Sequence, residues 1–539
     1  MAAAPAVRIR GLKIALPEGA ERRHAVDGVS FDLVAGEIVC VVGESGSGKS
    51  ICAHALMGLL PERVRIESGE IAFEGRDLLA LDAAGWRDLR GRRIAMVFQE
   101  PMTALNPLLR IGEQIMEMFE AHGLLSRRQR RQRALELAHE VGLPNPEQAV
   151  RAYPHQLSGG QRQRAMIAMA LALQPAVLVA DEPTTALDVT TQAQILKLIR
   201  DLQRRRQMAV MFITHDFGVV AEIADRVVVL RHGEVVEQGP AAEVLQHPRQ
   251  AYTRALLAAV PSMTPPPRPP LQNRARAVDV IGLDKTYVTS GGWFRPDRIV
   301  HAAIDVSFAI LQGETLGLVG ESGSGKSSIA RLLMRLVESD RGTVRIGDTD
   351  LTRLKGDALR QQRRRIQMIF QDPYASLNPR RKVGEIISDG PIAHGVDPKL
   401  ARARAGELLS LVGLDPGAMQ RYPHEFSGGQ RQRIGIARAL ALDPEILVAD
   451  EAVSALDVSV QAQVLALLED LKQRLGLSML FITHDLRVAA QVCDRIAVMQ
   501  HGKLLEVQPT AALFAAPQHP YTQELLAAVP GAAMVARSA

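Results

Sequence analysis

A stretch of eight residues decides how this chain is organised: Gly43-Glu44-Ser45-Gly46-Ser47-Gly48-Lys49-Ser50. It recurs, identical at every position, as Gly320-Glu321-Ser322-Gly323-Ser324-Gly325-Lys326-Ser327. A short apolar run bounded by glycine precedes each copy, at residues 38–42 and 316–319, and predicts a buried strand. Each half of the chain therefore contains a strand, then a glycine-rich loop that opens a helix.

This loop has the composition of a phosphate-binding site. Its glycines let backbone N–H groups point at one centre, and the next helix offers its positive end to an anion. Lys49 and Lys326 should reach the β- and γ-phosphates of a nucleotide, and Ser50 and Ser327 should ligate magnesium. A merely structural glycine turn is the alternative, and two identical copies after two strands disfavour it.

Three further segments recur in the same order. Tyr-Pro-His stands before Ser-Gly-Gly-Gln in both halves, an Asp-Glu pair follows, and Phe-Ile-Thr-His-Asp comes last. The loop copies are offset by 277 residues (320 − 43), and the later segments by 269 (427 − 158, 450 − 181 and 484 − 215). The second copy is thus 8 residues shorter between the first two segments, and the chain is a tandem repeat.

The halves meet in a segment rich in proline, residues 265–270. We expect a first domain over residues 1–262, a linker over 263–276 and a second domain over 277–539. The linker composition favours a semi-rigid polyproline spacer over a ligand for a proline-recognising domain. Strands alternating with helical patterns in each domain predict an α/β fold with a parallel sheet.

Two acids follow a buried apolar run in each half, Asp181-Glu182 and Asp450-Glu451. The first acid can hold magnesium directly or through water. Because neighbouring strand residues point in different directions, the second can face the attacking water. We assign Glu182 and Glu451 as general bases or water-orienting groups, over the alternative of solvated loop acids.

Gln99 and Gln371 follow the apolar runs 95–98 and 367–370, where an amide oxygen can touch magnesium or water. His215 and His484 follow the apolar runs 210–213 and 479–482. Each histidine stands 33 residues after the second acid (215 − 182 and 484 − 451), which favours a contact to the γ-phosphate over a core role.

A second phosphate-binding device precedes a helix in each half. Serine offers a hydroxyl, glycines expose backbone N–H groups and a helix start favours an anion. Each half's own loop already cradles phosphates, so this device needs a nucleotide delivered from elsewhere. Its residues are Ser158, Gly159, Gly160 and Gln161, and Ser427, Gly428, Gly429 and Gln430.

Composition narrows the class of protein. The net charge of +5, from 64 basic and 59 acidic residues, gives no nucleic-acid signal, and the arginine clusters at 127–131 and 363–365 are interpreted as solvated helix faces. Cys40, Cys52 and Cys493 form no metal-binding spacing, so we expect no metal cluster. We expect neither a signal peptide nor a membrane-spanning helix, so a transport role would need other chains to supply the pore.

Together these motifs resemble the nucleotide-binding subunits of ABC transporters, over nearly the whole chain. The resemblance implies two tandem P-loop NTPase domains, each with a RecA-like parallel-sheet core, an antiparallel β subdomain and a helical signature subdomain. It implies ATP and Mg²⁺ as cofactors, and two cassettes that sandwich two ATPs head to tail. The loop at Lys49 would then be completed by Ser427, and the loop at Lys326 by Ser158. Asp188 and Asp457 match the loop that links the two sites.

Finer features resemble the dipeptide, oligopeptide and nickel importers, and the fused architecture is similar to glutathione and microcin/peptide import ATPases. They include Glu44 and Glu321, the Tyr-Pro-His segments, and the tails at 247–253 and 519–522. This implies two membrane permeases and an extracytoplasmic substrate-binding protein as partners, no nucleic acid, and a peripheral position on the cytoplasmic face of the bacterial inner membrane. The segments after Gln99 and Gln371 would meet the permeases.

Two alternatives stay open. One is an importer of nickel or another solute, since the permeases and binding protein select the substrate. The other is a twin-cassette factor acting on ribosomes or DNA, disfavoured by the short proline-rich joint and the lack of zinc-binding cysteines. The halves also differ: Tyr287 suits the aromatic that stacks on adenine in this family, but Leu16 stands there in the first half, and Ala452-Val453 replaces Pro183-Thr184.

Overall fold

The computed structural model describes residues 4–20, 22–185, 187–269, 271, 273–289, 298–454 and 456–531. The chain divides into two compact units, the first formed by residues 1–260 together with those from Pro530 onwards, and the second by Pro261–Val529. Each unit has one six-stranded and one four-stranded sheet.

The six-stranded sheet of the first unit has the order β10-β9-β3-β8-β7-β6, parallel except for β10 at its edge. Its parallel strands β3, β6, β7 and β8 are buried throughout, as expected for apolar strands covered on both faces. The strands are β3 (Ile38–Val42), β6 (Ile94–Val97), β7 (Val177–Asp181), β8 (Ala209–Ile213), β9 (Arg226–Arg231) and β10 (Glu234–Pro240).

An antiparallel sheet of order β2-β1-β4-β5 shares a core with the first sheet and with helix α1 (Lys49–Leu56). Its strands are β1 (Pro5–Ala15), β2 (His24–Val34), β4 (Arg65–Phe73) and β5 (Arg76–Asp77), and α2 (Ala83–Leu89) follows them. Phe31 of β2 and Leu56 of α1 both lie in that core, so the helix opened by the phosphate loop is fixed between two sheets.

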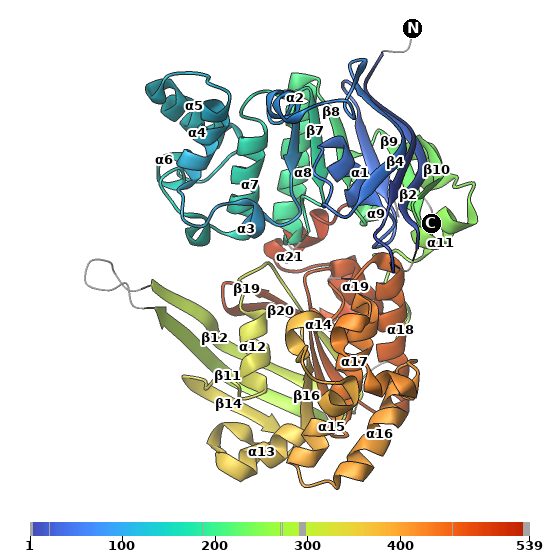
Figure 1. The fold of residues 1–539 in the computed structure, drawn as a ribbon. Coiled ribbons are helices and arrows are strands. Elements are labelled where there is room, and N and C mark those ends of the chain that lie inside the picture. Colours follow the sequence, from blue (N-terminus) through green and yellow to red (C-terminus); the bar gives the residue numbers. More distant parts are fainter. Residues whose placement is uncertain are drawn as a thin grey trace. The chain divides into compact units, whose positions relative to one another are not determined.

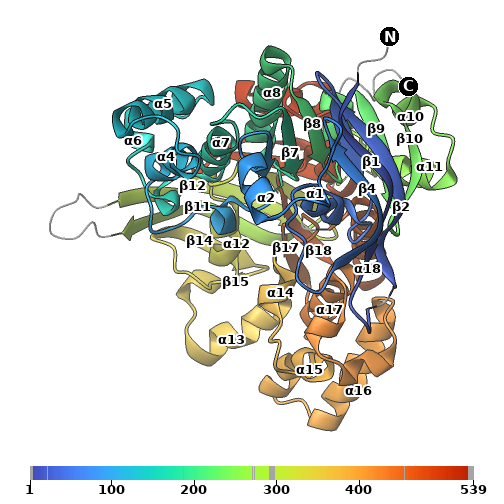
Figure 2. The same ribbon diagram turned by 45° about the horizontal axis from the view of Figure 1, so that its top comes forward.

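Helices inserted between β6 and β7 form a separate group, which Figures 1 and 2 show at the side of the first unit away from β1 and β2. The group comprises α3 (Pro101–Ala104), α4 (Ile111–Ala121), α5 (Arg127–Glu140), α6 (Pro146–Ala149) and α7 (Gly159–Ala170). After β7 come α8 (Val189–Arg206) and α9 (Phe217–Ile223), and the tail after β10 holds α10 (Ala241–Gln246) and α11 (Ala251–Ala258).

The second unit repeats this plan, with sheets of order β16-β17-β18-β13-β19-β20 and β12-β11-β14-β15. Its strands are β11 (Arg276–Thr289), β12 (Arg298–Leu311), β13 (Thr315–Val319), β14 (Arg341–Ile346), β15 (Thr349–Asp350), β16 (Ile366–Ile369), β17 (Ile446–Asp450), β18 (Ser478–Thr483), β19 (Arg495–Gln500) and β20 (Lys503–Pro509). Its helices are α12 (Lys326–Leu333), α13 (Gly356–Arg365), α14 (Pro373–Ser376), α15 (Val383–Ala393), α16 (Pro398–Leu411), α17 (Gly428–Leu440), α18 (Val458–Leu475), α19 (Leu486–Val492), α20 (Thr510–Ala515) and α21 (Pro520–Ala527).

The expected α/β architecture is confirmed in each unit: a largely parallel sheet, an antiparallel sheet and a helical insertion before the strand that carries the two acids. The apolar runs given above, at 38–42, 95–98, 210–213, 316–319, 367–370 and 479–482, are all strands, with ends that differ from the expected ones by one residue at most. The buried runs before the two acid pairs are strands β7 and β17.

The arginines at 363–365 are exposed or half-buried and helix α13 has no buried residue, as a solvated face implies. They also make contacts that the sequence did not predict. Arg363 donates to the carbonyls of Met334 and Arg335, and Arg364 donates to that of Leu442 at 3.2 Å. Arg365 forms a two-pronged ion pair with Glu445, at 2.7 and 2.8 Å. These three side chains tie the end of α13 to neighbouring segments.

The proline-rich segment is attached to the second unit by its polar groups. Arg268 pairs with Asp494 at 3.0 Å and donates to the carbonyl of Gln491. The side-chain amide of Gln491 in turn donates to the carbonyls of Ser262 and Thr264, at 2.8 and 2.9 Å. This part of the joint between the halves thus has a defined path.

Candidate functional site

The phosphate loop of the first unit connects β3 to α1, and two of its glycines are fixed by close backbone approach. Gly43 (φ 150°) and Gly48 (φ 105°) adopt left-handed conformations. A Cβ atom would lie 2.2 Å from the carbonyl oxygen of Leu230 at the first and 2.6 Å from that of Ala25 at the second. The loop of the second unit repeats both conformations and both close approaches. The strand–loop–helix context expected from the sequence is therefore present twice.

The loop lysines are buried and held by their own loops. Lys49 Nζ donates to the carbonyls of Gly43 and Glu44, at 2.8 and 2.9 Å. Lys326 Nζ donates to the same pair in its loop, Gly320 and Glu321, at 2.7 Å each. The position of each ammonium group thus depends on the first two residues of the loop.

A hydroxyl and a carboxylate meet beside each loop. Ser50 Oγ donates to Asp181 Oδ1 at 3.0 Å, and Ser327 Oγ donates to Asp450 Oδ1 at 3.2 Å. Burial raises the pKa of Asp181, the bond from Ser50 opposes that rise and the charge of Glu182 adds to it. Hydroxyl and carboxylate oxygens are ligands that Mg²⁺ accepts, together with phosphate oxygens and water, so this pair fits the expected ion.

The second acid of each pair lies just beyond its strand, in a left-handed backbone conformation. The φ angle is 45° at Glu182 and 47° at Glu451. The backbone N–H of Glu182 donates to the carbonyl oxygen of Ile213 at 3.0 Å, and that of Glu451 donates to the carbonyl oxygen of Ile482 at 2.9 Å. The expected divergence of the two acids is present, but its cause is this turn and not the alternation of side chains along a strand.

Three predicted side chains converge in each unit, although they come from distant segments. Gln99 Nε2 donates to Glu182 Oε2 at 3.1 Å, and His215 Nδ1 lies 3.3 Å from Glu182 Oε1. In the second unit the corresponding distances to Glu451 Oε2 are 2.8 Å from Gln371 Nε2 and 3.3 Å from His484 Nδ1. The structure therefore places glutamine, glutamate and histidine together at the carboxyl ends of three parallel strands.

The histidine and the glutamate stabilise each other's charged forms. Burial alone would lower the pKa of His215, but the hydrogen bond and charge of Glu182 outweigh it and raise that pKa. Burial would raise the pKa of Glu182, but His215 outweighs it and lowers that pKa. The same directions hold for His484 and Glu451.

The two glutamates differ in one contact that the sequence analysis did not predict. Thr185 Oγ1 donates to Glu182 Oε2 at 3.0 Å. The hydroxyl of Ser454, three residues after Glu451, donates instead to the backbone carbonyl of that glutamate at 3.0 Å. In the sequence, this asymmetry is visible only as the replacement of Thr184-Thr185 by Val453-Ser454.

The Ser-Gly-Gly-Gln segments start helices α7 and α17. Ser158 Oγ accepts from the N–H of Gln161 at 3.3 Å, and Gln161 Oε1 accepts from the N–H of Ser158 at 3.0 Å. Ser427 and Gln430 form the same reciprocal cap. Both serines are exposed, which suits a device that meets a nucleotide held elsewhere.

The predicted adenine contact differs between the units. Tyr287 lies on β11 with Lys285 Nζ 5.6 Å from its ring centre, and its buried hydroxyl has no hydrogen-bond partner in the described part of the chain. Leu16 follows β1 and packs against the core of its unit. The adenine role of Tyr287 stays a prediction.

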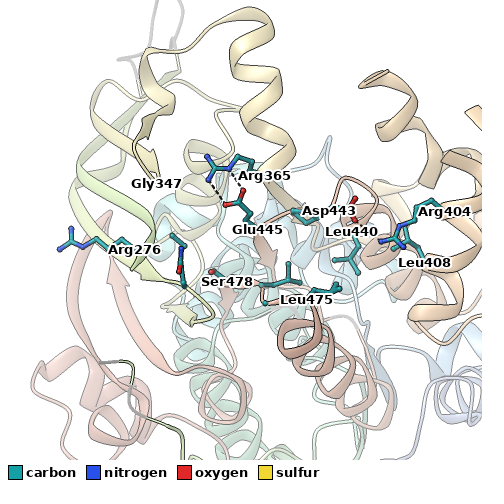
Figure 3. A pocket seen from close by; sticks show the side chains of 15 residues that line it. Arg276, Gly347, Arg365, Arg404, Leu408, Leu440, Asp443, Glu445, Leu475 and Ser478 are labelled. Carbon is teal, nitrogen blue, oxygen red and sulfur yellow. Dashed lines mark hydrogen bonds and ion pairs between the residues drawn. The ribbon is translucent and has the colours of Figure 1, made fainter. Parts of the chain in front are cut away.

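A cavity of about 440 Å³ in the second unit is unrelated to these residues (Figure 3). Its lining includes Glu445 and Ser478, which stand at the amino ends of β17 and β18, the edge of the sheet opposite to the acids. Four of its charged groups pair with each other, Arg365 with Glu445 and Arg404 with Asp443, and Arg276 pairs with Asp279 outside the lining. Ligands of parallel sheets bind at the carboxyl ends of the strands, so this cavity is not the candidate site.

The described residues contain no helix long and apolar enough to cross a membrane. The three cysteines are buried, and burial raises the pKa of the Cys52 and Cys493 thiols to about 12. Thiols with such pKa values stay protonated at neutral pH and make poor metal ligands.

Two family models match the sequence. One, described as ABC transporter, covers residues 26–185 and 304–454, and the other, described as Oligopeptide/dipeptide transporter, C-terminal region, covers 236–285 and 505–537. The glutathione import ATP-binding protein GsiA of Pectobacterium atrosepticum is 48% identical over 97% of this chain and 89% of its own. The peptidoglycan transport ATP-binding protein YejF of Agrobacterium fabrum is 47% identical over 97% and 96%. Among solved structures, the dimeric ATP-binding cassette MJ0796 with bound ADP and Pi is 32% identical over 44% of this chain and 98% of its own, with a TM-score of 0.40.

Proposed function

The chain belongs to the ABC transporter family as an ATP-hydrolysing subunit, and on this premise we propose that it powers the import of peptides. The proposal assigns residues 1–262 and 277–539 to two cassettes. Support comes from the oligopeptide/dipeptide transporter region matched in both halves and from relatives named for glutathione import and peptidoglycan transport. Its partners would be two membrane permeases and a substrate-binding protein, with the chain bound peripherally to the cytoplasmic face of the bacterial inner membrane.

The observation that carries the mechanism is the convergence of glutamine, glutamate and histidine in each unit. The Glu182 carboxylate accepts a proton from the attacking water or orients it towards the γ-phosphorus. His215 uses Nδ1 towards Glu182, which leaves Nε2 to donate to a γ-phosphate oxygen. Lys49 neutralises charge on the β- and γ-phosphates.

The oxygens of Ser50 and Asp181, and of Ser327 and Asp450, would hold Mg²⁺. Gln99 and Gln371, whose Nε2 atoms donate to Glu182 and Glu451, would offer their amide oxygens to the same ion. When bound, the ion supplies positive charge to the phosphate oxygens. Burial makes a lone Asp181 carboxylate unfavourable, as its raised pKa shows, and a cation offsets that cost.

We further propose that neither half owns a complete site. The exposed cap at Ser427 would complete the nucleotide site at Lys49, and the cap at Ser158 the site at Lys326. Fusion of both halves in one chain raises their effective concentration and fixes their pairing. Closure on ATP and reopening after hydrolysis would then drive the permeases.

The test of hydrolysis is the double substitution Glu182→Gln with Glu451→Gln. ATP binding should persist, because the phosphate loops are unchanged, and turnover should fall by about 100-fold or more, as expected for loss of a general base. Undiminished turnover in the double variant would exclude the assigned role of both glutamates.

The test of the substrate uses the chain assembled with its permeases and binding protein in vesicles. Uptake of labelled glutathione or a short peptide should depend on ATP and vanish in the double variant. Uptake of nickel but not of peptide would show that the substrate is a metal ion and not a peptide, and would leave the ATPase assignment unchanged. Purification with ribosomes and without permeases would support the twin-cassette factor instead.

A further inference from the structure

A tyrosine from the C-terminal tail of each unit contacts the phosphate loop of the same unit. The hydroxyl of Tyr252 on α11 donates to Glu44 Oε2 at 3.2 Å, across 208 residues of sequence. In the second unit, the N–H of Glu321 donates to the hydroxyl of Tyr521 on α21 at 3.1 Å, across 200 residues. Both contacts join the tail to the second residue of the loop.

A glutamate on the preceding edge strand fixes each tail. Glu237 of β10 accepts from the N–H groups of Arg249 and Gln250, at 2.7 and 3.2 Å. Glu506 of β20 accepts in the same way from Gln518 and His519, at 2.8 and 3.1 Å. These bonds hold the chain just before α11 and α21, so each tyrosine is presented from an anchored helix.

The anchor of the second unit is also ionised at neutral pH. The buried hydroxyl of Thr522 donates to Glu506 Oε2 at 2.6 Å. Burial acts to raise the pKa of Glu506, but the bonds from Thr522, Gln518 and His519 outweigh it and lower that pKa. Charge-assisted bonds of this kind are the stronger class of hydrogen bond, which makes the anchor a rigid one.

The contacted loop residue is one of the two that position the loop lysine. The carbonyl of Glu44 accepts from Lys49 Nζ at 2.9 Å, and the carbonyl of Glu321 accepts from Lys326 Nζ at 2.7 Å. Two contacts therefore separate each tail tyrosine from the ammonium group that meets the phosphates. Tyr252 is further held by the Arg231 guanidinium, 4.7 Å from its ring centre.

We propose that Tyr252 and Tyr521 are positioning residues of the two nucleotide sites, which hold the phosphate loops through Glu44 and Glu321 so that the lysines are set for ATP. This role rests on the proposed ATPase function only for the measurement of KM and kcat; nucleotide affinity can be measured without it. The proposal gives the tails a role inside their own cassettes, and a shift of a tail would change the affinity of that cassette for nucleotide.

The experiment uses the full chain with Tyr252→Phe and Tyr521→Phe combined. Loss of one hydrogen bond per loop should raise the KM for ATP, and the Kd of a fluorescent ATP analogue, by about 3- to 10-fold. The value of kcat should change little, because glutamine, glutamate and histidine keep their contacts. Ser410→Ala removes one exposed hydroxyl, which donates to the carbonyl of Gly406 on the same helix α16, and should leave both constants unchanged.

A double-mutant cycle in the first unit tests the path through Glu44. Tyr252→Phe should have little further effect on nucleotide affinity once Glu44→Ala is present. Additive effects, or wild-type KM and Kd in the double tyrosine variant, would overturn the proposal. Unchanged affinity with a lower melting temperature would assign the tyrosines a structural role only. A wild-type chain that binds the analogue without hydrolysing ATP would refute the proposed function but leave this test measurable.

Discussion

At the residue scale, Glu182 and Glu451 combine strain with convergent contacts. Left-handed backbone at a non-glycine residue costs about 1–3 kcal/mol and persists where neighbours over-determine it. At Glu182 this conformation is held by the backbone hydrogen bond to the adjacent strand and by the contacts of the side chain with Gln99 and His215. The sequence predicted which residues meet, because buried parallel strands bring their carboxyl ends to one edge. The sequence could not predict the left-handed turn at these glutamates, because no residue type there is specific to such a turn.

The contact from Thr185 predicts unequal sensitivity of the two sites. Thr185→Val keeps the shape of the side chain but removes the bond to Glu182, so turnover of the first site should fall about 3- to 10-fold. ATPase rates measured in the Glu451→Gln background report that site alone. Ser454→Ala in the Glu182→Gln background is the matched control, and it should cost less because Ser454 bonds only the backbone of its glutamate. Equal losses in the two backgrounds would refute the asymmetry.

The histidine–glutamate pairs predict a stability difference that depends on pH. The raised pKa of His215 gives stability that is complete below its ordinary value of 6.5 and is lost as pH rises through the raised value. The lowered pKa of Glu182 gives stability that is present above 4.5 and is lost as pH falls through the lowered value. His215→Gln with His484→Gln should therefore lower the melting temperature more at about pH 5.5 than at about pH 9. A difference that is constant over this range would show that the pairs carry no charge.

At the element scale, the sequence predicted single elements and strand ends better than it predicted contacts between distant helices and loops. Continuous apolar runs identified the buried strands because both faces of a parallel sheet are covered. The sequence analysis singled out the two tails but not the contacts of their tyrosines with the phosphate loops, because these contacts span 200 residues or more. The bonds from Arg363 to backbone carbonyls were not predicted, because a run of charges on a helix does not reveal which carbonyls accept from it.

The joint between the halves carries a prediction at this scale. Arg268 is mostly buried against Asp494, which also accepts from Lys472 and from the N–H of Thr315. Arg268→Ala should release the proline-rich segment while the second unit keeps its fold, because Asp494 retains two partners. Limited proteolysis should then cut within 261–269 several times faster than in the wild-type chain. Arg274→Ala, which removes one exposed bond to the Gln312 carbonyl, is the control, and equal protection of both variants would show that Arg268 does not hold the segment.

At the scale of the whole molecule, the chain is a duplication whose copies have diverged around a constant set of reacting groups. Lysine, glutamate, glutamine and histidine occupy the same places in both units, with contacts that agree within a few tenths of an ångström. The differences lie beside them, in Leu16 against Tyr287 and in Pro183 against Ala452. The repeat offset made this plan visible from sequence, since two motif sets in register allow one fold to be placed twice.

Because lysine, glutamate, glutamine and histidine are present in both units, we expect that both sites hydrolyse ATP and that both are needed for transport. Glu182→Gln alone and Glu451→Gln alone should each leave at most about half of the ATPase rate, and less if the two sites act as one unit. Import into vesicles should fail in each single variant if, as proposed, each site is completed by the other half, so that reopening requires hydrolysis at both. Single variants should still bind two ATP analogues per chain, which separates lost chemistry from lost binding. Normal import in either single variant would show that the site it disables is dispensable.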